Sequence, residues 1–136
     1  MRALYHARAI LAGANPTSVM STSDRNAYAA AAIGGVLLWL GASALGGRRE
    51  AWDSSLYWVV AYPASIVVAG VVAVFASVRP WRWGLTIMLA QAVTLAITSM
   101  SFGLLPLGMI LFAILAVPPM LGALVGAAVG ARLRRG

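Results

Sequence analysis

The sequence predicts an all-α integral membrane protein, a four-transmembrane-helix bundle with both chain termini in the cytoplasm. Three observations support this fold class. Of the 136 residues, 62% are hydrophobic and 10% are charged, whereas a soluble domain has about 45–50% apolar and about 25% charged residues. The ten arginines and three carboxylates are too few to cover a water-soluble surface. These charges also stand at the ends of long uncharged stretches, as they do in membrane proteins.

Residues 1–25 are expected to form a cytoplasmic tail that is either amphipathic or disordered. Apolar residues between Leu4 and Leu11 recur on one helical face, with the arginines largely elsewhere. That arrangement is typical of a helix lying on a membrane surface. A polar linker follows, and translation from Met1 and translation from Met20 both fit the sequence.

The first two spans are marked by charges, because a charge at the bilayer centre costs several kcal/mol. Uncharged stretches cover residues 26–47 and 54–78. Each is close to the roughly 20 residues that cross about 30 Å of hydrocarbon as a helix. Within a transmembrane domain at 26–131, we therefore predict spans at about 27–46 and 55–78, with Ser23 or Asp24 capping the first.

The next uncharged stretch, residues 84–131, is too long for a single crossing. As one helix its 48 residues would extend about 72 Å. A turn is expected at 101–108, because Gly103 and Gly108 permit unusual backbone angles and Pro106 lacks an amide hydrogen. This predicts spans at about 84–101 and 107–131, followed by a basic cytoplasmic tail at 132–136.

The arginines predict the orientation in the membrane. Eight arginines fall on the side that holds both termini, and only Arg48 and Arg49 fall on the other side. The positive-inside rule then places both termini in the cytoplasm, and we expect a multi-pass protein of the cell (inner) membrane. Aromatic residues near the predicted span ends are expected to form belts at headgroup depth: Trp39, Trp52, Tyr57 and Trp58 outside, and Tyr28, Trp81 and Trp83 inside.

Two predicted spans each have a face of small residues. The fourth carries two consecutive GxxxG units, a glycine zipper of Gly122, Gly126 and Gly130, and the second carries Ala61, Ser65, Ala69 and Ala73. Residues four apart share a helix face, so such faces let another backbone approach closely. We predict that these seven residues form helix-packing interfaces. One face is expected to close the bundle, and the other to bind a second copy or another integral membrane protein.

The third predicted span has a polar stripe. Gln91, Thr94, Thr98 and Ser101 are spaced so that they lie along one helix face. Polar groups inside a bilayer need partners, and serine and threonine hydroxyls commonly bond back to their own helix. We interpret the stripe as a set of polar residues that stabilise helix packing, in which Gln91 forms a hydrogen bond to another segment. A pore or solute path along the stripe is the alternative.

Prolines are expected to interrupt two spans. Pro63 lies early in the second span, and Pro118 and Pro119 lie within the fourth. Each frees a carbonyl about four residues earlier, such as those of Val59 and Leu115. In transporters such breaks expose backbone groups to substrate. Here we favour kinks that serve helix packing.

The loop before the third span alternates arginine and tryptophan. Arg79, Trp81, Arg82 and Trp83 are predicted to contact lipid headgroups, because guanidinium groups pair with phosphate and indole rings favour the interface.

Catalytic chemistry is not expected. The predicted spans contain no His, Cys, Lys, Arg, Asp or Glu, the side chains on which acid–base catalysis and proton-coupled transport depend. With no cysteine and His6 as the only histidine, no metal and no cofactor are expected. Nucleic acid is not an expected partner either, since the arginines flank the spans instead of gathering on a soluble face. Membrane lipids remain as partners.

Several segments resemble a known group in their order and spacing. They are Tyr62-Pro63 with Ser65, the run from Arg79 to Gly84, Gln91, the run from Leu105 to Gly108, and Pro118. Over roughly residues 57–120 the chain is similar to a family of small, uncharacterised four-span bacterial membrane proteins. The resemblance implies a four-span fold and brings no function with it.

The function expected from the sequence is that of a non-enzymatic accessory or structural subunit. It would pack through its small-residue faces in a homo-oligomer or a larger membrane complex. One alternative is an oligomeric pore or carrier for a small uncharged solute. Another is an anionic-lipid-binding membrane protein.

Overall fold

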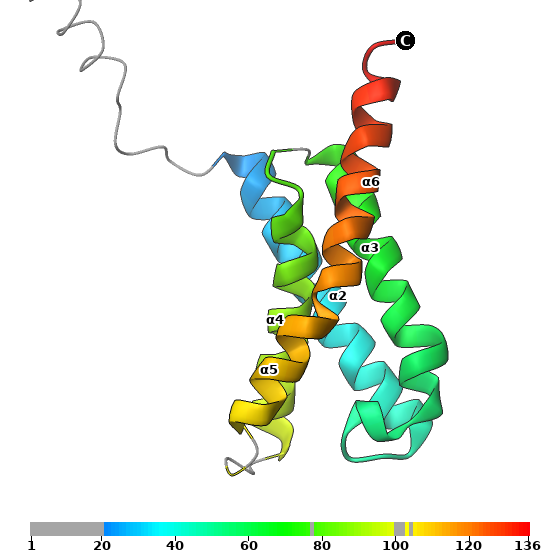
Figure 1. The fold of residues 1–136 in the computed structure, drawn as a ribbon, viewed down its shortest axis with the longest axis vertical. Coiled ribbons are helices and arrows are strands. Elements are labelled where there is room, and N and C mark those ends of the chain that lie inside the picture. Colours follow the sequence, from blue (N-terminus) through cyan, green and yellow to red (C-terminus); the bar gives the residue numbers. More distant parts are fainter. Residues whose placement is uncertain (1–20, 77, 100–102, 104) are drawn as a thin grey trace, which may run out of the picture.

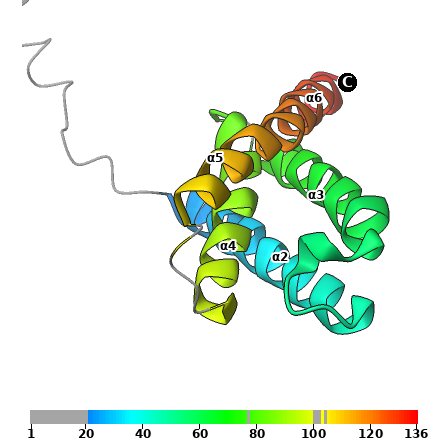
Figure 2. The ribbon, with the colours of Figure 1, turned by 60° about the horizontal axis from the view of Figure 1, so that its bottom comes forward.

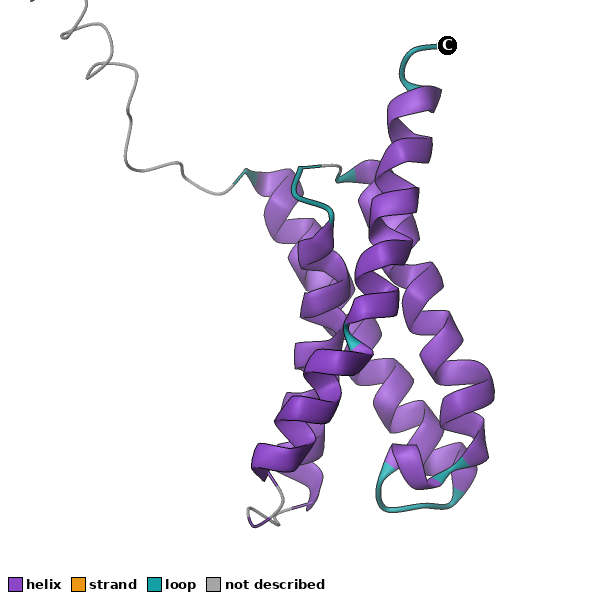
Figure 3. Cartoon of the chain, viewed as in Figure 1, coloured by secondary structure: helices purple, strands orange, loops and turns teal. Residues whose placement is uncertain are grey.

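The computed structural model describes residues 21–76, 78–99, 103 and 105–136, and this part of the chain is helical without any strand (Figures 1 and 3). The predicted helical bundle is confirmed. Its α-helices are α2 (Thr22–Gly46), α3 (Tyr62–Phe75), α4 (Trp81–Ser99), α5 (Leu105–Leu115) and α6 (Val117–Leu133). A 3-10 turn at Ala51–Asp53 and a π-helical turn at Tyr57–Ala61 lie between α2 and α3.

The helices run alternately along one long axis. α2 and α4 run one way, and α3 and the consecutive pair α5–α6 run back (Figure 1). The start of α2, the α3–α4 connection and the C-terminus therefore share one end of the bundle, which we call the arginine end (Figure 1). In the tilted view α3 lies against α6, and α2 lies against α4 (Figure 2). Buried side chains of these helices form one hydrophobic core.

Three helical stretches are long and apolar enough to cross a membrane, as expected of a membrane protein: Thr22–Gly46, Tyr57–Phe75 and Pro106–Leu133. The remaining helix, α4, has 19 residues and carries polar side chains along its length. Eight of its residues are buried, including Gln91 and Thr94. α4 can therefore carry more polar side chains than the other three stretches, because much of its surface faces other helices.

The start of α2 differs from the expectation, whereas its last residue, Gly46, is the predicted one. The cap is Ser21, whose Oγ accepts a hydrogen bond from the amide of Asp24 at 3.1 Å, so the expectation of Ser23 or Asp24 was wrong. The helix therefore begins at Thr22, inside the segment expected to be a tail. At its other end Gly47 adopts φ 62°, a left-handed angle that glycine tolerates, and the helix stops there. The rest of the expected tail, with Met20, lies outside the described residues.

Both predicted interruptions are present, and packing accommodates them. Ahead of Pro63 the backbone widens into the π-helical turn, in which the Tyr62 amide bonds to the Tyr57 carbonyl. Ahead of Pro118 and Pro119 the helix is interrupted, since α5 ends at Leu115 and α6 begins at Val117. The Leu115 carbonyl, four residues before Pro119, accepts a hydrogen bond of 3.1 Å from the Tyr62 hydroxyl. The π-helical turn thus positions Tyr62, and the hydroxyl of Tyr62 binds the carbonyl exposed at the break between α5 and α6. The two irregularities therefore support each other.

Candidate functional site

The glycines of α6 lie directly against the backbone of α3. A Cβ added to Gly126 would overlap the carbonyl of Gly70, and one added to Gly122 would lie 2.8 Å from the carbonyl oxygen of Ile66. At Gly130 an added Cβ would overlap the carbonyl oxygen of Val74. Real Cβ atoms essentially never approach backbone this closely. The glycine face of α6 is therefore filled by α3 of the same chain.

The small face of the second span also lies inside the bundle. Ala69, Ala73 and Ser65 are fully buried, and Ala61 is nearly so. The hydroxyl of Ser65 donates a hydrogen bond to the Tyr62 carbonyl at 2.6 Å. This row lies next to the Ile66–Gly70–Val74 row that meets α6, because consecutive residues are offset by about 100° around a helix. We expected one of the two small faces to bind a partner, but the structure uses both within the chain.

A cluster of aromatic rings fills the end of the bundle opposite the arginine end. Trp39 and Tyr57 are fully buried, with ring centroids 5.6 Å apart. Phe112 contacts Trp39 at 5.7 Å and stacks on Trp52 at 5.8 Å. Trp39 and Tyr57 are thus core residues and not members of a headgroup belt, which corrects the expectation. Trp58, 44% exposed, keeps the outward position expected of a belt residue.

A buried hydrogen bond joins this cluster to α4. The Tyr57 hydroxyl donates to Oε1 of Gln91 at 2.7 Å, and both side chains are fully buried. Gln91 was expected to bond to another segment, and it does. Its Nε2 and the Trp39 indole nitrogen have no hydrogen-bond partner in the described part of the chain. Tyr57 was not expected to be that partner, because its place near a predicted span end indicated an interfacial residue.

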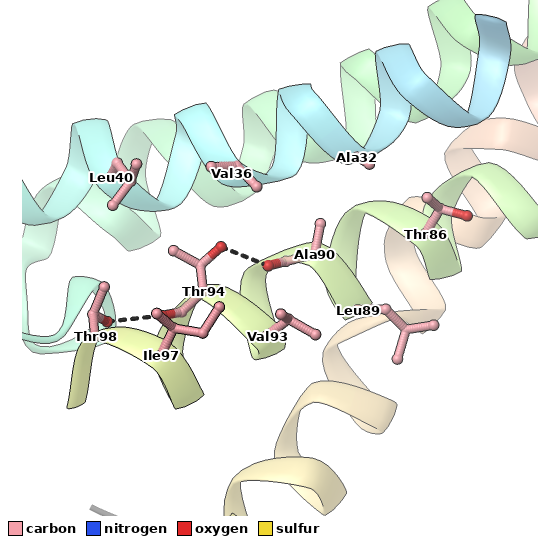
Figure 4. A pocket seen from close by; sticks show the side chains of 10 residues that line it. All are labelled: Ala32, Val36, Leu40, Thr86, Leu89, Ala90, Val93, Thr94, Ile97 and Thr98. Carbon is pink, nitrogen blue, oxygen red and sulfur yellow. Dashed lines mark hydrogen bonds between the residues drawn. The ribbon is translucent and has the colours of Figure 1, made fainter. Parts of the chain in front are cut away.

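The threonines of the stripe bond within α4. The Thr94 hydroxyl donates to the Ala90 carbonyl at 2.7 Å, and the Thr98 hydroxyl donates to the Thr94 carbonyl at 2.8 Å (Figure 4). Ser101 lies outside the described residues. The hydroxyls of Thr94 and Thr98 and the Oε1 of Gln91 therefore bond within the chain, and the two threonines stand beside an otherwise apolar groove.

That groove runs between α2 and α4 and has a volume of about 600 Å³. Ala32, Val36 and Leu40 of α2 form one side, and Figure 4 shows α4 residues from Thr86 to Thr98 forming the other. Val93 and Ile97 are more than half exposed along it. The groove opens to the surroundings of the bundle and not to its core.

The predicted lipid-headgroup cluster divides into two parts. Trp83 is only 1% exposed, its indole nitrogen donates to the Ala76 carbonyl at 2.6 Å, and its ring packs edge-on against Tyr28 at 4.9 Å. It therefore ties α4 to the end of α3 and cannot reach a headgroup, which corrects the expectation. Trp81 is 40% exposed, and the Arg82 guanidinium lies 5.9 Å from its ring centroid. Arg79 is also exposed.

The loop between α2 and α3 is held by tryptophans. The Trp52 indole donates to the Glu50 carboxylate at 2.6 Å, and the Trp58 indole donates to the Trp52 carbonyl at 2.9 Å. Leu56 is anchored through its amide to the Ser54 hydroxyl at 3.1 Å. These bonds fix the loop beneath the aromatic cluster.

Within the described ranges no three His, Cys, Asp or Glu side chains come together as a metal site would require. Comparison with known proteins finds no matching family model, no matching curated protein and no matching solved structure.

Proposed function

We propose that the chain is a non-enzymatic, multi-pass accessory or structural subunit of the bacterial inner membrane. It contacts its partners through the outward-facing sides of its helices, in a homo-oligomer or in a larger membrane complex. The observation that carries this proposal is the use of the small and polar span residues inside the chain. The glycine face of α6 is filled by α3, and Gln91 is bonded to Tyr57. A partner protein would then bind to the outward faces of the helices.

Four spans and cytoplasmic termini are part of the proposal. α4 runs beside α2 and covers a similar length of the bundle (Figure 1). If α2, α3 and α5–α6 cross the bilayer, α4 crosses with them, because its polar residues largely face its neighbours. The arginine end carries Arg25, Arg79, Arg82, Arg132, Arg134 and Arg135 against Asp24, whereas the other end has two arginines and two carboxylates. The positive-inside rule assigns the arginine end to the cytoplasm.

The outward faces are apolar enough for membrane partners as well as for lipid. Large hydrophobic side chains are exposed on every helix, among them Leu37 of α2, Val67 of α3, Ile97 of α4 and Leu124 of α6. Association between helices in a bilayer depends on packing, not on removal from water. A partner is therefore expected to cover one face and leave the others to lipid.

This proposal is tested by extracting the protein from its native membrane in a polymer that retains lipid, followed by native mass spectrometry. We expect a fixed complex heavier than one chain. Single cysteines at Leu37, Val67, Ile97 and Leu124 then map the contact, since the chain has no other cysteine. A cross-linker should join the partner from one of these faces and not from all four.

Two outcomes would overturn the proposal. One is a single chain that carries lipid only, with no cross-linked partner from any face. The other is solute flux by the purified protein in liposomes that is lost in the Gln91→Leu, Thr98→Val variant, which would establish the pore or carrier instead.

A further inference from the structure

The groove between α2 and α4 continues toward charged residues at the arginine end. Arg82 precedes Thr86 by four residues on α4, and Arg25 precedes Ala32 by seven residues on α2. Residues four or seven apart share a helix face. Both arginines therefore lie on the faces that form the groove, beyond the end marked by Thr86 and Ala32.

The hydroxyl of Thr86 differs from those of the other two threonines of the groove. Thr94 and Thr98 donate to carbonyls of their own helix, whereas no hydrogen bond of the Thr86 hydroxyl occurs in the described part of the chain. In Figure 4 its oxygen lies at the end of the row of groove residues, on the side from which α4 begins. A half-buried donor thus stands between the apolar groove and the two arginines.

We infer that this groove binds one anionic glycerophospholipid of the cytoplasmic leaflet. An acyl chain would lie along Val36, Val93 and Ile97, the Thr86 hydroxyl would bond to the ester region, and Arg25 and Arg82 would pair with the phosphate. This inference rests on the proposed orientation in the bilayer and does not depend on a protein partner.

The dimensions of the groove fit this occupant. From Thr86 to Thr98 the α4 face extends about 18 Å at 1.5 Å per residue, and one leaflet supplies about 15 Å of hydrocarbon, half of the roughly 30 Å core. The groove therefore runs along about one acyl chain. A transmembrane helix of a partner would be about twice as long and would not account for the arginines at one end.

Charge favours an anionic over a zwitterionic headgroup. Arg25 is exposed and Arg82 is half-buried beside the Trp81 ring. Asp24 is the one carboxylate of the described residues at this end, and it points about 100° away from Arg25 around α2. A basic residue near a membrane surface contributes about 1 kcal/mol toward an anionic lipid. Two arginines then give a preference of about 30-fold.

The test uses the full chain in nanodiscs that contain equal amounts of phosphatidylglycerol and phosphatidylcholine with identical acyl chains. Native mass spectrometry after stepwise activation counts the lipids retained on the protein. We expect one phosphatidylglycerol to be retained, with a preference of about 30-fold that Arg25→Gln, Arg82→Gln abolishes. The matched control, Arg132→Gln, Arg135→Gln, should keep the preference. It removes the same charge at the same end, from Arg132 in the last turn of α6 and from Arg135 just beyond that helix.

A second pair of variants tests the groove itself. Val93→Trp fills it, and Val71→Trp adds the same bulk to an exposed site on α3. Only Val93→Trp should release the lipid, and circular dichroism should show both variants equally helical. Equal losses in the two arginine pairs would overturn the inference, because they would indicate unspecific charge attraction. Retention of phosphatidylglycerol in Val93→Trp, or a protein cross-linked to a cysteine at Val93, would overturn it as well. A missing protein partner would affect only the proposed function.

Discussion

Replacement of Gly126 by alanine is expected to destabilise the bundle by about 1–3 kcal/mol, although alanine is the better helix former. Helix propensity alone would favour alanine by up to about 1 kcal/mol. The added methyl group would overlap the Gly70 carbonyl, and a backbone atom cannot move aside as a flexible side chain can. α3 and α6 must then separate along their length, so the steric cost exceeds the gain in propensity. Unfolding in mixed detergent micelles, followed by circular dichroism, measures the difference.

Gly41 provides the matched control for this substitution. It lies within α2, and a Cβ added there would have no neighbour within 4 Å. Gly41→Ala is therefore expected to leave the free energy of unfolding unchanged or raise it by up to about 1 kcal/mol. Equal effects of Gly41→Ala and Gly126→Ala would contradict the direct backbone contact between α3 and α6.

Removal of the buried Gln91 side chain is expected to cost about 1–3 kcal/mol in the same unfolding measurement. Gln91→Leu conserves the approximate volume but leaves the Tyr57 hydroxyl buried without its acceptor. Tyr57→Phe should cost a comparable amount, since it leaves Oε1 of Gln91 without its donor. The double variant should cost less than the sum of the two single variants, because neither polar group then remains.

A double-mutant cycle gives the strength of this bond. Interhelical hydrogen bonds in membrane proteins contribute about 0.6 kcal/mol on average and at most about 1.7, and we expect the upper part of that range because both side chains are fully buried. Thr98→Val is the control, since the Thr98 hydroxyl bonds to its own helix and the side chain is exposed. Additive effects of the two single variants would show that Tyr57 and Gln91 do not interact.

Much of the architecture is predictable from the sequence, because in a bilayer few residue types are permitted at each depth. Charged residues marked the helix ends, and prolines marked the breaks in the second and fourth helical stretches. The glycine spacing on α6 predicted a close helix contact, and Gln91 predicted a bond to another segment. These features are set by local geometry or by the cost of an unpaired polar group.

The sequence was less informative where the same residue type serves two purposes. Trp39 and Trp83 near helix ends have the pattern of interfacial residues, yet both are buried, and Trp83 bonds to the Ala76 carbonyl. Whether a glycine face meets the same chain or another depends on which helices become neighbours. Connection lengths alone do not settle that choice, since α3 is followed in sequence by α4 but lies most closely against α6.

The glycine face of α6 packs on α3 within one chain. Cysteines at positions 66 and 122 test this packing most directly, and the chain has no other cysteine. A Cβ on Gly122 would lie 2.7 Å from the Cγ2 of Ile66, which Ile66→Cys removes, and 2.8 Å from the Ile66 carbonyl oxygen. The small shift that relieves this overlap leaves the two Cβ atoms near the roughly 3.5–4.5 Å that a disulfide needs. Mild oxidation of Ile66→Cys, Gly122→Cys should give a disulfide inside the monomer. Mixed samples of the two single variants should give no dimer containing one chain of each. Efficient formation of that mixed dimer, with little disulfide inside the double variant, would contradict the claim and make this face an interface between chains.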